Sequence, residues 1–168
     1  RDGTVYVASD GQGGSSVLWV SEDDMATWRD PGGRTYGRHT TFALLSDGNT
    51  ILGMGGKNTQ IDGFMPKSVS TDGGKTWEKD ATPFCWQGTN QRPSLLRLAS
   101  GRLFFAGDFQ CTKGGEPKAV ARRGSYVALS GDDGRTWRVK ALPGAQSHES
   151  GLMGGAGTLG YSAARQAP

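Results

Sequence analysis

An eight-residue motif that occurs three times constrains this chain most. Ser70-Thr71-Asp72-Gly73-Gly74-Lys75-Thr76-Trp77 recurs as Ser130-Gly131-Asp132-Asp133-Gly134-Arg135-Thr136-Trp137 and, with one departure, as Ser21-Glu22-Asp23-Asp24-Met25-Ala26-Thr27-Trp28. The shared pattern is Ser-x-Asp-x-Gly-x-Thr-Trp. An aspartate can accept hydrogen bonds from turn N–H groups, and glycine adopts a positive φ, so each copy is expected to close a β-hairpin.

The first copy departs from the pattern at its glycine position, where Met25 stands in place of Gly74 and Gly134. Positive φ is sterically costly for a side chain with a Cβ atom. We therefore expect this turn either to differ in geometry or to carry backbone strain.

Short apolar runs alternate with turn signals around the motifs and predict strands. The predicted strands are residues 5–8, 16–21, 42–45, 50–54, 67–70, 94–98, 103–107, 125–129 and 138–142. The 28 glycines and 35% hydrophobic residues among 168 also favour many short strands and turns over a helical bundle. We expect an all-β protein.

The motif resembles the Asp-box, or bacterial neuraminidase repeat, of the sialidase-like β-propellers. That resemblance implies four-stranded blades with the Asp-box between strands three and four. The boxed tryptophans are roughly 50 and 60 residues apart, which suits one blade per repeat. In this family the boxes are structural and lie away from the active site. The expected structural residues are Ser21, Asp23, Trp28, Ser70, Asp72, Gly74, Trp77, Ser130, Asp132, Gly134 and Trp137.

We expect residues 1–168 to form one partial sialidase-like propeller domain of about three blades, or half of a six-bladed propeller. Blade a spans about 1–36, blade b about 37–88 and blade c about 89–150, with the first strand of a further blade at about 158–168. The fourth strands are expected to be short, as in residues 138–142. The chain is interpreted as cut at both ends, so its partner would be the rest of its own propeller.

In such blades the loop that precedes strand one and the loop between strands two and three share the end opposite the boxes. Sialidase-like catalysis uses three arginines for the substrate carboxylate, an aspartate as acid/base, and a tyrosine nucleophile paired with a glutamate. Carried over by position, Asp62 and Asp108 are the catalytic candidates. The substrate-binding candidates are Arg38, Arg92, His39, His148 and Glu149.

Some features depart from the family pattern or have a simpler explanation. Neither Arg38 nor Arg92 stands in the Arg-Ile-Pro sequence of the family. Asp62 precedes a glycine, so it can instead be a turn-former. Tyr126 fits a core position, and the nucleophilic tyrosine with its glutamate is expected in later blades.

The function hypothesis is a fragment of an exo-α-sialidase-type glycoside hydrolase that releases terminal acidic sugars from glycans. The alternatives are a non-catalytic propeller that binds carbohydrate or protein, and a purely structural blade array. The formal charge is +3, and the basic residues are scattered, which disfavours nucleic acid as a partner. No apolar run suggests a membrane span, and no Cys/His cluster suggests a metal, so no cofactor is expected.

The two cysteines flank the first two strands of blade c. Antiparallel strands bring these ends together, so Cys85 and Cys111 can form a disulfide. A bridge would agree with a secreted, extracellular or periplasmic protein, whereas two separate thiols would suit a reducing cytosol.

Overall fold

The computed structural model describes residues 3–57, 59–86, 92–109, 124–146 and 162–167. These residues form β-strands and one short 3₁₀ turn, η1 (Gln12–Gly14), with no α-helix among them. The strands are β1 (Val5–Asp10), β2 (Ser16–Ser21), β3 (Thr41–Leu44), β4 (Ile51–Met54), β5 (Phe64–Ser70), β6 (Glu78–Cys85), β7 (Ser94–Arg97), β8 (Leu103–Phe109), β9 (Gly124–Ser130) and β10 (Arg138–Gln146). The expected all-β class is confirmed.

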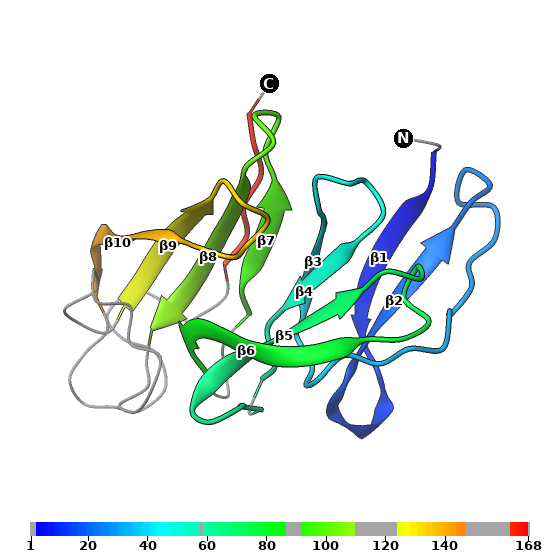
Figure 1. The fold of residues 1–168 in the computed structure, drawn as a ribbon, viewed down its shortest axis with the longest axis horizontal. Helices are drawn as coiled ribbons and strands as arrows, with labels where there is room; N and C mark the ends of the chain where they lie inside the picture. The colour runs from blue at the N-terminus through cyan, green and yellow to red at the C-terminus, as the bar shows by residue number, and fades with distance from the viewer. Residues whose placement is uncertain (1–2, 58, 87–91, 110–123, 147–161, 168) are drawn as a thin grey trace.

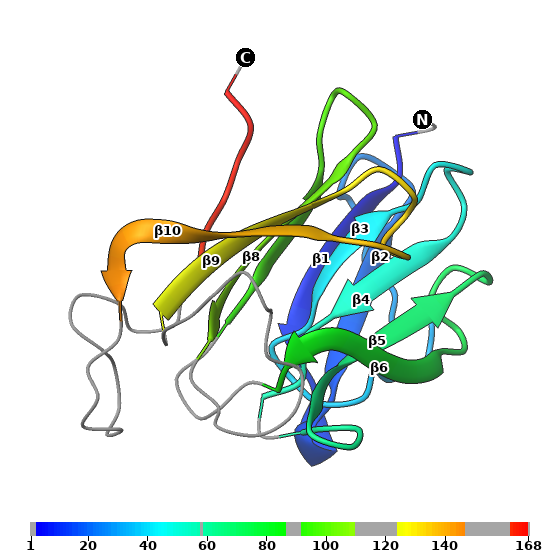
Figure 2. The same cartoon turned by 60° about the vertical axis from the view of Figure 1, so that its left-hand side comes forward.

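The strands form three antiparallel sheets in chain order (Figures 1 and 2). The first sheet contains β1 and β2. The second has the order β3-β4-β5-β6, and the third has the order β7-β8-β9-β10. Each four-stranded sheet is an up-and-down meander, so the architecture is consistent with part of a propeller.

The fourth strands differ from the expectation, because β6 has eight residues and β10 has nine. In the sequence, the charged residues and the proline of Glu78–Cys85 are typical of a loop. The pairing of β6 with β5 shifts register between Phe64 and Pro66, and β10 shifts between Ala141 and Gln146. Prolines are tolerated on edge strands and at such irregularities, so both strands continue past them.

An aromatic cluster joins the second and third sheets. Phe84 of β6 stacks on Phe105 of β8 with ring centroids 5.1 Å apart, and on Tyr126 of β9 at 5.5 Å. Trp137 of the third box meets the Phe84 ring edge-on at 5.6 Å. Phe84, Phe105 and Tyr126 are at most 3% exposed. Burial, together with the nearby Asp108 carboxylate, raises the pKa of Tyr126, which fits the core role expected of it.

The three boxes share one hydrogen-bond pattern. In the second box, Ser70 Oγ donates to Asp72 at 2.8 Å and accepts from the Gly74 N–H at 2.9 Å. The same aspartate accepts from the Thr76 N–H at 3.0 Å and from the Thr76 hydroxyl. The equivalent bonds recur in the third box around Asp132 and in the first around Asp23. The turn chemistry inferred from the motif is therefore present in all three copies.

The C-terminal residues 162–167 run beside β7 (Figure 1). The N–H of Ser162 donates to the Arg92 carbonyl at 2.8 Å, and the N–H of Ala164 donates to Ser94 Oγ at 3.2 Å. These residues belong to the segment predicted as the first strand of a further blade. They lie beside β7 and are not paired as a strand with any strand in the described part of the chain.

Candidate functional site

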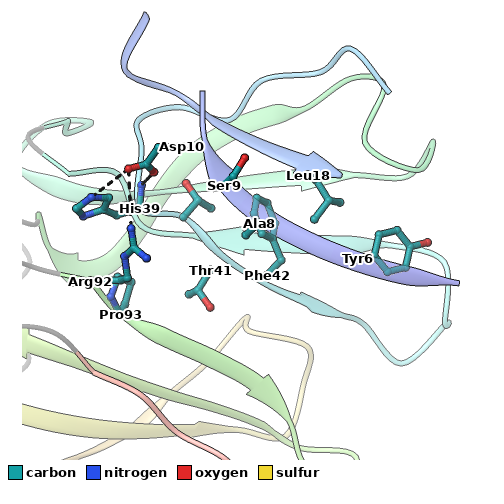
Figure 3. Close-up of a pocket in the computed structure, with 11 residues that line it drawn as sticks. Tyr6, Ala8, Ser9, Asp10, Leu18, His39, Thr41, Phe42, Arg92 and Pro93 are labelled. Carbon is teal, nitrogen blue, oxygen red and sulfur yellow. Dashed lines mark hydrogen bonds and ion pairs between the residues drawn. The ribbon is translucent and has the colours of Figure 1, made fainter. Parts of the chain in front are cut away.

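The candidate site lies at the end of the first sheet opposite its Asp-box. In the pairing of β1 with β2, Val5 faces Ser21 of the box, whereas Asp10 faces Ser16 at the other end. A pocket of about 310 Å³ opens between β1, β3 and the residues before β7. Its polar end is formed by Asp10, His39 and Arg92, and its apolar end by Tyr6, Leu18 and Phe42 (Figure 3).

Asp10 is the centre of the polar end. One carboxylate oxygen accepts from the His39 backbone N–H at 2.8 Å, and the other lies 3.2 Å from His39 Nε2. Arg92 brings a guanidinium nitrogen to 3.9 Å from the same carboxylate (Figure 3). Three segments distant in sequence therefore meet at one carboxyl group.

The exposure of the three side chains differs in a way that suits ligand binding. The His39 side chain is 8% exposed and that of Asp10 is 32% exposed, whereas the Arg92 side chain is 53% exposed. A guanidinium carries five N–H donors in a planar fork. Because its distance to Asp10 is long for a hydrogen bond, Arg92 has donors available for an anion such as a carboxylate.

Asp10 was missed by the sequence analysis, although the repeat contains a signal for it. Val5 of β1 pairs with the box serine Ser21, and Leu103 of β8 pairs with the box serine Ser130. Counted from these two residues, Asp10 and Asp108 occupy equivalent positions in their strands. The local sequences agree, because Ala8-Ser9-Asp10 corresponds to Ala106-Gly107-Asp108. Aligning the strands on the box serines would have found Asp10.

Asp108 itself has a different environment from Asp10. Asp108 lies on β8 and is 3% exposed. Its carboxylate accepts a hydrogen bond from the Ser125 hydroxyl at 3.2 Å. It does not line the pocket described above.

Asp62 lies in the tight turn that joins Ile61 to Phe64. It is exposed with φ 53°, and Gly63 follows with φ 88°. This is the turn-forming arrangement that the Asp-Gly pair also predicted. Asp62 is not among the described residues that line the pocket.

Two of the remaining candidates, Arg38 and Cys85, lie in the described part of the chain, and neither lines the pocket. Arg38 is exposed and precedes His39, and its backbone forms an isolated bridge with Lys57. His148, Glu149 and Cys111 lie outside the described residues. Cys85 is 3% exposed and disulfide-bonded.

Within the described ranges, no group of three or more His, Cys, Asp or Glu side chains is placed to hold a metal ion. No helix in the same ranges has the length and apolar character needed to cross a bilayer.

Comparison with known proteins adds structural likeness only. No family model and no curated protein sequence matches the chain. A mutant of Trypanosoma rangeli sialidase displaying trans-sialidase activity superposes with a TM-score of 0.59 at 15% identity, over 84% of this chain and 24% of that one. The intramolecular trans-sialidase from Ruminococcus gnavus gives 0.57 at 16% identity, over 85% and 32%. A protein of unknown function from Dyadobacter fermentans gives 0.55 at 18%, over 83% and 38%.

In each case the chain covers well under half of the longer protein. Likeness at these identities establishes architecture and not activity. The chain has a sialidase-like all-β fold.

Proposed function

We propose that this chain is part of a sialidase-like glycoside hydrolase of the exo-α-sialidase type, which binds a terminal acidic sugar at the polar end of the pocket. The observation that supports this most is the half-exposed Arg92 guanidinium beside Asp10 and His39, at the end of the sheets opposite the boxes. Similar folds include Trypanosoma rangeli sialidase in complexes with 2,3-difluorosialic acid and with the inhibitor DANA.

In this proposal Arg92 and Arg38 donate forked hydrogen bonds to the sugar carboxylate. Asp10 holds His39 and Arg92 in place, and His39 contacts the ligand from the wall of the pocket. Asp62 and Asp108 remain the proposed sources of the proton for the leaving oxygen. His148 and Glu149 are proposed as further substrate contacts.

The proposed setting follows from the substrate. Sialosides terminate extracellular glycans, so we infer a secreted, extracellular or periplasmic protein whose partner is a carbohydrate and not a nucleic acid. The full enzyme would comprise this chain and the remainder of a six-bladed propeller, with the three sheets as its blades.

Binding is tested by titrating the 168-residue chain with N-acetylneuraminic acid and with its methyl ester. The ester lacks the negative charge and should bind more weakly than the acid. Arg92→Ala should weaken binding of the acid by roughly 10- to 100-fold, because a hydrogen bond to a charged group is lost, and Arg92→Lys should recover only part of the affinity.

The matched control is Arg102→Ala, because Arg102 is an exposed arginine whose Nε donates to Ser100 in the turn between β7 and β8. This variant should bind as the parent does. Equal affinity of the parent and Arg92→Ala for the acid would contradict the proposed carboxylate site.

Catalytic roles are tested separately, in the intact protein that contains the remaining blades, with an activated sialoside. Asp62→Asn should lower kcat far more than it changes binding, if Asp62 donates the proton. Asp10→Asn should weaken both binding and turnover, because it releases His39 and Arg92 together. An Asp62→Asn variant as active as the parent would remove Asp62 from the mechanism.

One observation favours the alternative of a non-catalytic propeller that binds carbohydrate. Asp62 stands in an exposed turn and Asp108 is buried on β8, so neither proposed proton donor lines the described pocket. A binding protein would retain the Arg92-dependent affinity for the acid sugar and show no turnover of the sialoside.

A further inference from the structure

The backbone at His39 is strained, and the repeat of the fold does not require the strain. His39 has a φ of 61°, a left-handed conformation that is costly for a residue with a Cβ atom. Aligned on the box serines, Thr41 of β3 corresponds to Ser94 of β7, so His39 corresponds to Arg92. Arg92 is not among the described residues with a positive φ. The strain is therefore specific to His39.

In this conformation His39 contacts one carboxylate with two nitrogen atoms. Its backbone N–H donates to Asp10 Oδ1 at 2.8 Å, and its Nε2 lies 3.2 Å from Asp10 Oδ2. Both oxygens of Asp10 are thus engaged by His39, while a guanidinium nitrogen of Arg92 remains at 3.9 Å (Figure 3). Strained residues persist only where the surrounding structure holds them in place, and they concentrate at functional sites.

Three buried hydroxyl groups hold the segment that contains His39. They belong to Ser16, Thr35 and Thr40, which are at most 6% exposed, and we call them the hydroxyl cluster. The N–H of Thr40, next to His39, donates to Ser16 Oγ at 3.0 Å. Thr35 Oγ1 accepts from the Ser16 N–H at 3.1 Å, lies 3.1 Å from Thr40 Oγ1 and donates to the Gly37 carbonyl at 2.9 Å. The cluster therefore bonds to backbone groups before and after His39.

The hydroxyl cluster connects His39 to the strand that carries its partner. Ser16 is the residue opposite Asp10 in the pairing of β1 with β2. Through Ser16, the residue that follows His39 is fixed to the same pair of strands as the Asp10 carboxylate. A buried polar group without a partner is costly, so these bonds favour a single arrangement of the segment.

Close backbone packing restricts the same segment from the side of β4. A Cβ atom added at Gly37 would lie 2.6 Å from Gly56 Cα. One added at Gly55 would lie 2.7 Å from the His39 carbonyl oxygen and 3.0 Å from Thr40 Cα. The glycines that follow β4 therefore leave the backbone at His39 little room to relax.

From these contacts we propose that Thr35 and Thr40 are positioning residues, which act on the anion site through His39. They hold His39 in its left-handed conformation, where it engages both oxygens of Asp10. If His39 moved away, the Asp10 carboxylate would be left to the Arg92 guanidinium, and a closer ion pair would use the donors that Arg92 offers to a ligand. The role in ligand binding rests on the proposed function, whereas the control of the contact between His39 and Asp10 does not.

Nuclear magnetic resonance of the His39 ring tests the positioning role without any ligand. The ring signals are identified by their loss in His39→Gln, and Asp10→Asn shows where they lie when the carboxylate charge is removed. Thr35→Val keeps the side-chain shape but lacks the hydroxyl, so it should shift the His39 signals toward their position in Asp10→Asn. Thr35→Ser retains the hydroxyl and should restore the parent signals.

Two further variants separate positioning from a general loss of stability. Thr40→Val removes one hydroxyl and keeps the backbone N–H, so it provides a second test where Thr35→Val fails to fold. Ser68→Ala is the control, because Ser68 is 2% exposed and its Oγ accepts the Tyr36 N–H of the same segment at 3.2 Å. This control removes a buried hydroxyl outside the hydroxyl cluster and should leave the His39 signals in place.

The consequence for binding is measured by titration with N-acetylneuraminic acid. Thr35→Val should weaken the affinity by roughly 2- to 10-fold, the range expected for one lost hydrogen bond, and Thr35→Ser should recover it. Ser68→Ala should bind the acid as the parent does. In a double-mutant cycle, Thr35→Val and Asp10→Asn should be non-additive, because both act on the same contact.

The two readouts can fail independently. His39 signals that stay at the parent position in folded Thr35→Val and Thr40→Val proteins would overturn the positioning role, whatever the affinity for the sugar. An equal shift in Ser68→Ala would overturn it as well. Shifted signals with unchanged affinity would contradict the link to the ligand. A parent protein that does not bind the acid would refute the proposed carboxylate site, and the shift in Thr35→Val would still support the positioning of His39 against Asp10.

Discussion

The backbone N–H of Met25 donates to Ser21 Oγ at 3.0 Å, as Gly74 and Gly134 donate to Ser70 and Ser130 at 2.9 and 2.8 Å. Met25 makes this bond with φ 70°, close to the 88° and 85° of the two glycines. Of the two outcomes expected from the substitution, the turn keeps its geometry and carries the strain. The Met25 residue is 60% exposed, so little burial offsets that strain.

Met25→Gly is therefore expected to stabilise the protein. A residue with a Cβ atom in the left-handed conformation destabilises the folded state by roughly 1–2 kcal/mol, and glycine removes this strain. Glycine also makes the unfolded chain more flexible, which offsets part of the effect, so the expected net stabilisation is about 0.5–1 kcal/mol. Urea denaturation measures the difference in free energy of unfolding. Ala26→Gly, one position later where φ is not positive, should destabilise instead. A Met25→Gly variant less stable than the parent would show that the turn is unstrained.

The boxes should make folding stability depend on acid pH. Hydrogen bonds from Thr76 and Ser70 lower the pKa of Asp72 from 3.8 to about 2, and the equivalent bonds do the same for Asp132. Because the folded pKa lies below the unfolded one, the stabilisation is present above about pH 4 and is lost as the pH falls toward 2. The thermal midpoint of the parent should drop over this window.

The double variant Asp72→Asn with Asp132→Asn should be less stable at neutral pH and should show a smaller drop between pH 4 and pH 2. Glu78→Gln, on the exposed surface of β6, serves as the control. An unchanged acid dependence in the double variant would exclude the boxes as its source.

Replacing a boxed tryptophan by phenylalanine should lower the free energy of unfolding by different amounts at Trp77 and Trp137. Trp137 Nε1 donates to the Gly134 carbonyl at 3.0 Å, whereas the buried Trp77 Nε1 has no partner among the described residues. Replacement by phenylalanine breaks a bond at Trp137 but removes an unsatisfied donor at Trp77. Trp137→Phe should therefore cost about 1–2 kcal/mol more unfolding free energy than Trp77→Phe. Equal costs would indicate that the Trp77 indole is satisfied in solution.

The Asp133 carboxylate in the third box accepts hydrogen bonds from residues of both the second and the third sheet. Asp133 accepts from Arg97 Nη1 at 3.1 Å and from the backbone N–H and hydroxyl of Ser46, in the turn between β3 and β4. Asp133→Asn keeps the side-chain shape and tolerates its positive φ, and should cost about 1 kcal/mol. In a double-mutant cycle, Asp133→Asn and Arg97→Gln should be non-additive. Strict additivity would mean that the pair does not interact in solution.

Cys85 is disulfide-bonded, and the chain has two cysteines. We predict that titration of the denatured, unreduced protein finds no free thiol. If the bridge joins Cys85 to Cys111, it closes about 27 residues, and its reduction should lower stability by ~3 kcal/mol on the loop-entropy model. Two reactive thiols before reduction would contradict the bridge.

Local sequence determined the strands and the box turns, because their interactions join residues close in the chain. The bonds of Asp72 to Ser70 and Thr76 span at most four residues, so the motif alone predicted them. The Asp62-Gly63 pair likewise predicted a turn from local sequence alone. The lengths of β6 and β10 could not be predicted in this way, because Pro83 and Pro143 are typical of loops. The structure shows that register shifts in both pairings allow the strands to continue past these prolines.

The candidate site depended on the tertiary structure. Asp10, His39 and Arg92 meet because the end of β1 lies against the residues that lead into β3 and β7, and no local pattern places such distant residues together. The environments of Asp10 and Asp108 also diverge despite equivalent positions in the repeat. Among the described strands, β8 lies between β7 and β9 and Asp108 is 3% exposed, whereas β1 pairs with β2 and the Asp10 side chain is 32% exposed. Sequence periodicity determined which position along the strand carries an aspartate, and the packing of neighbouring strands decided whether its carboxylate reaches a pocket.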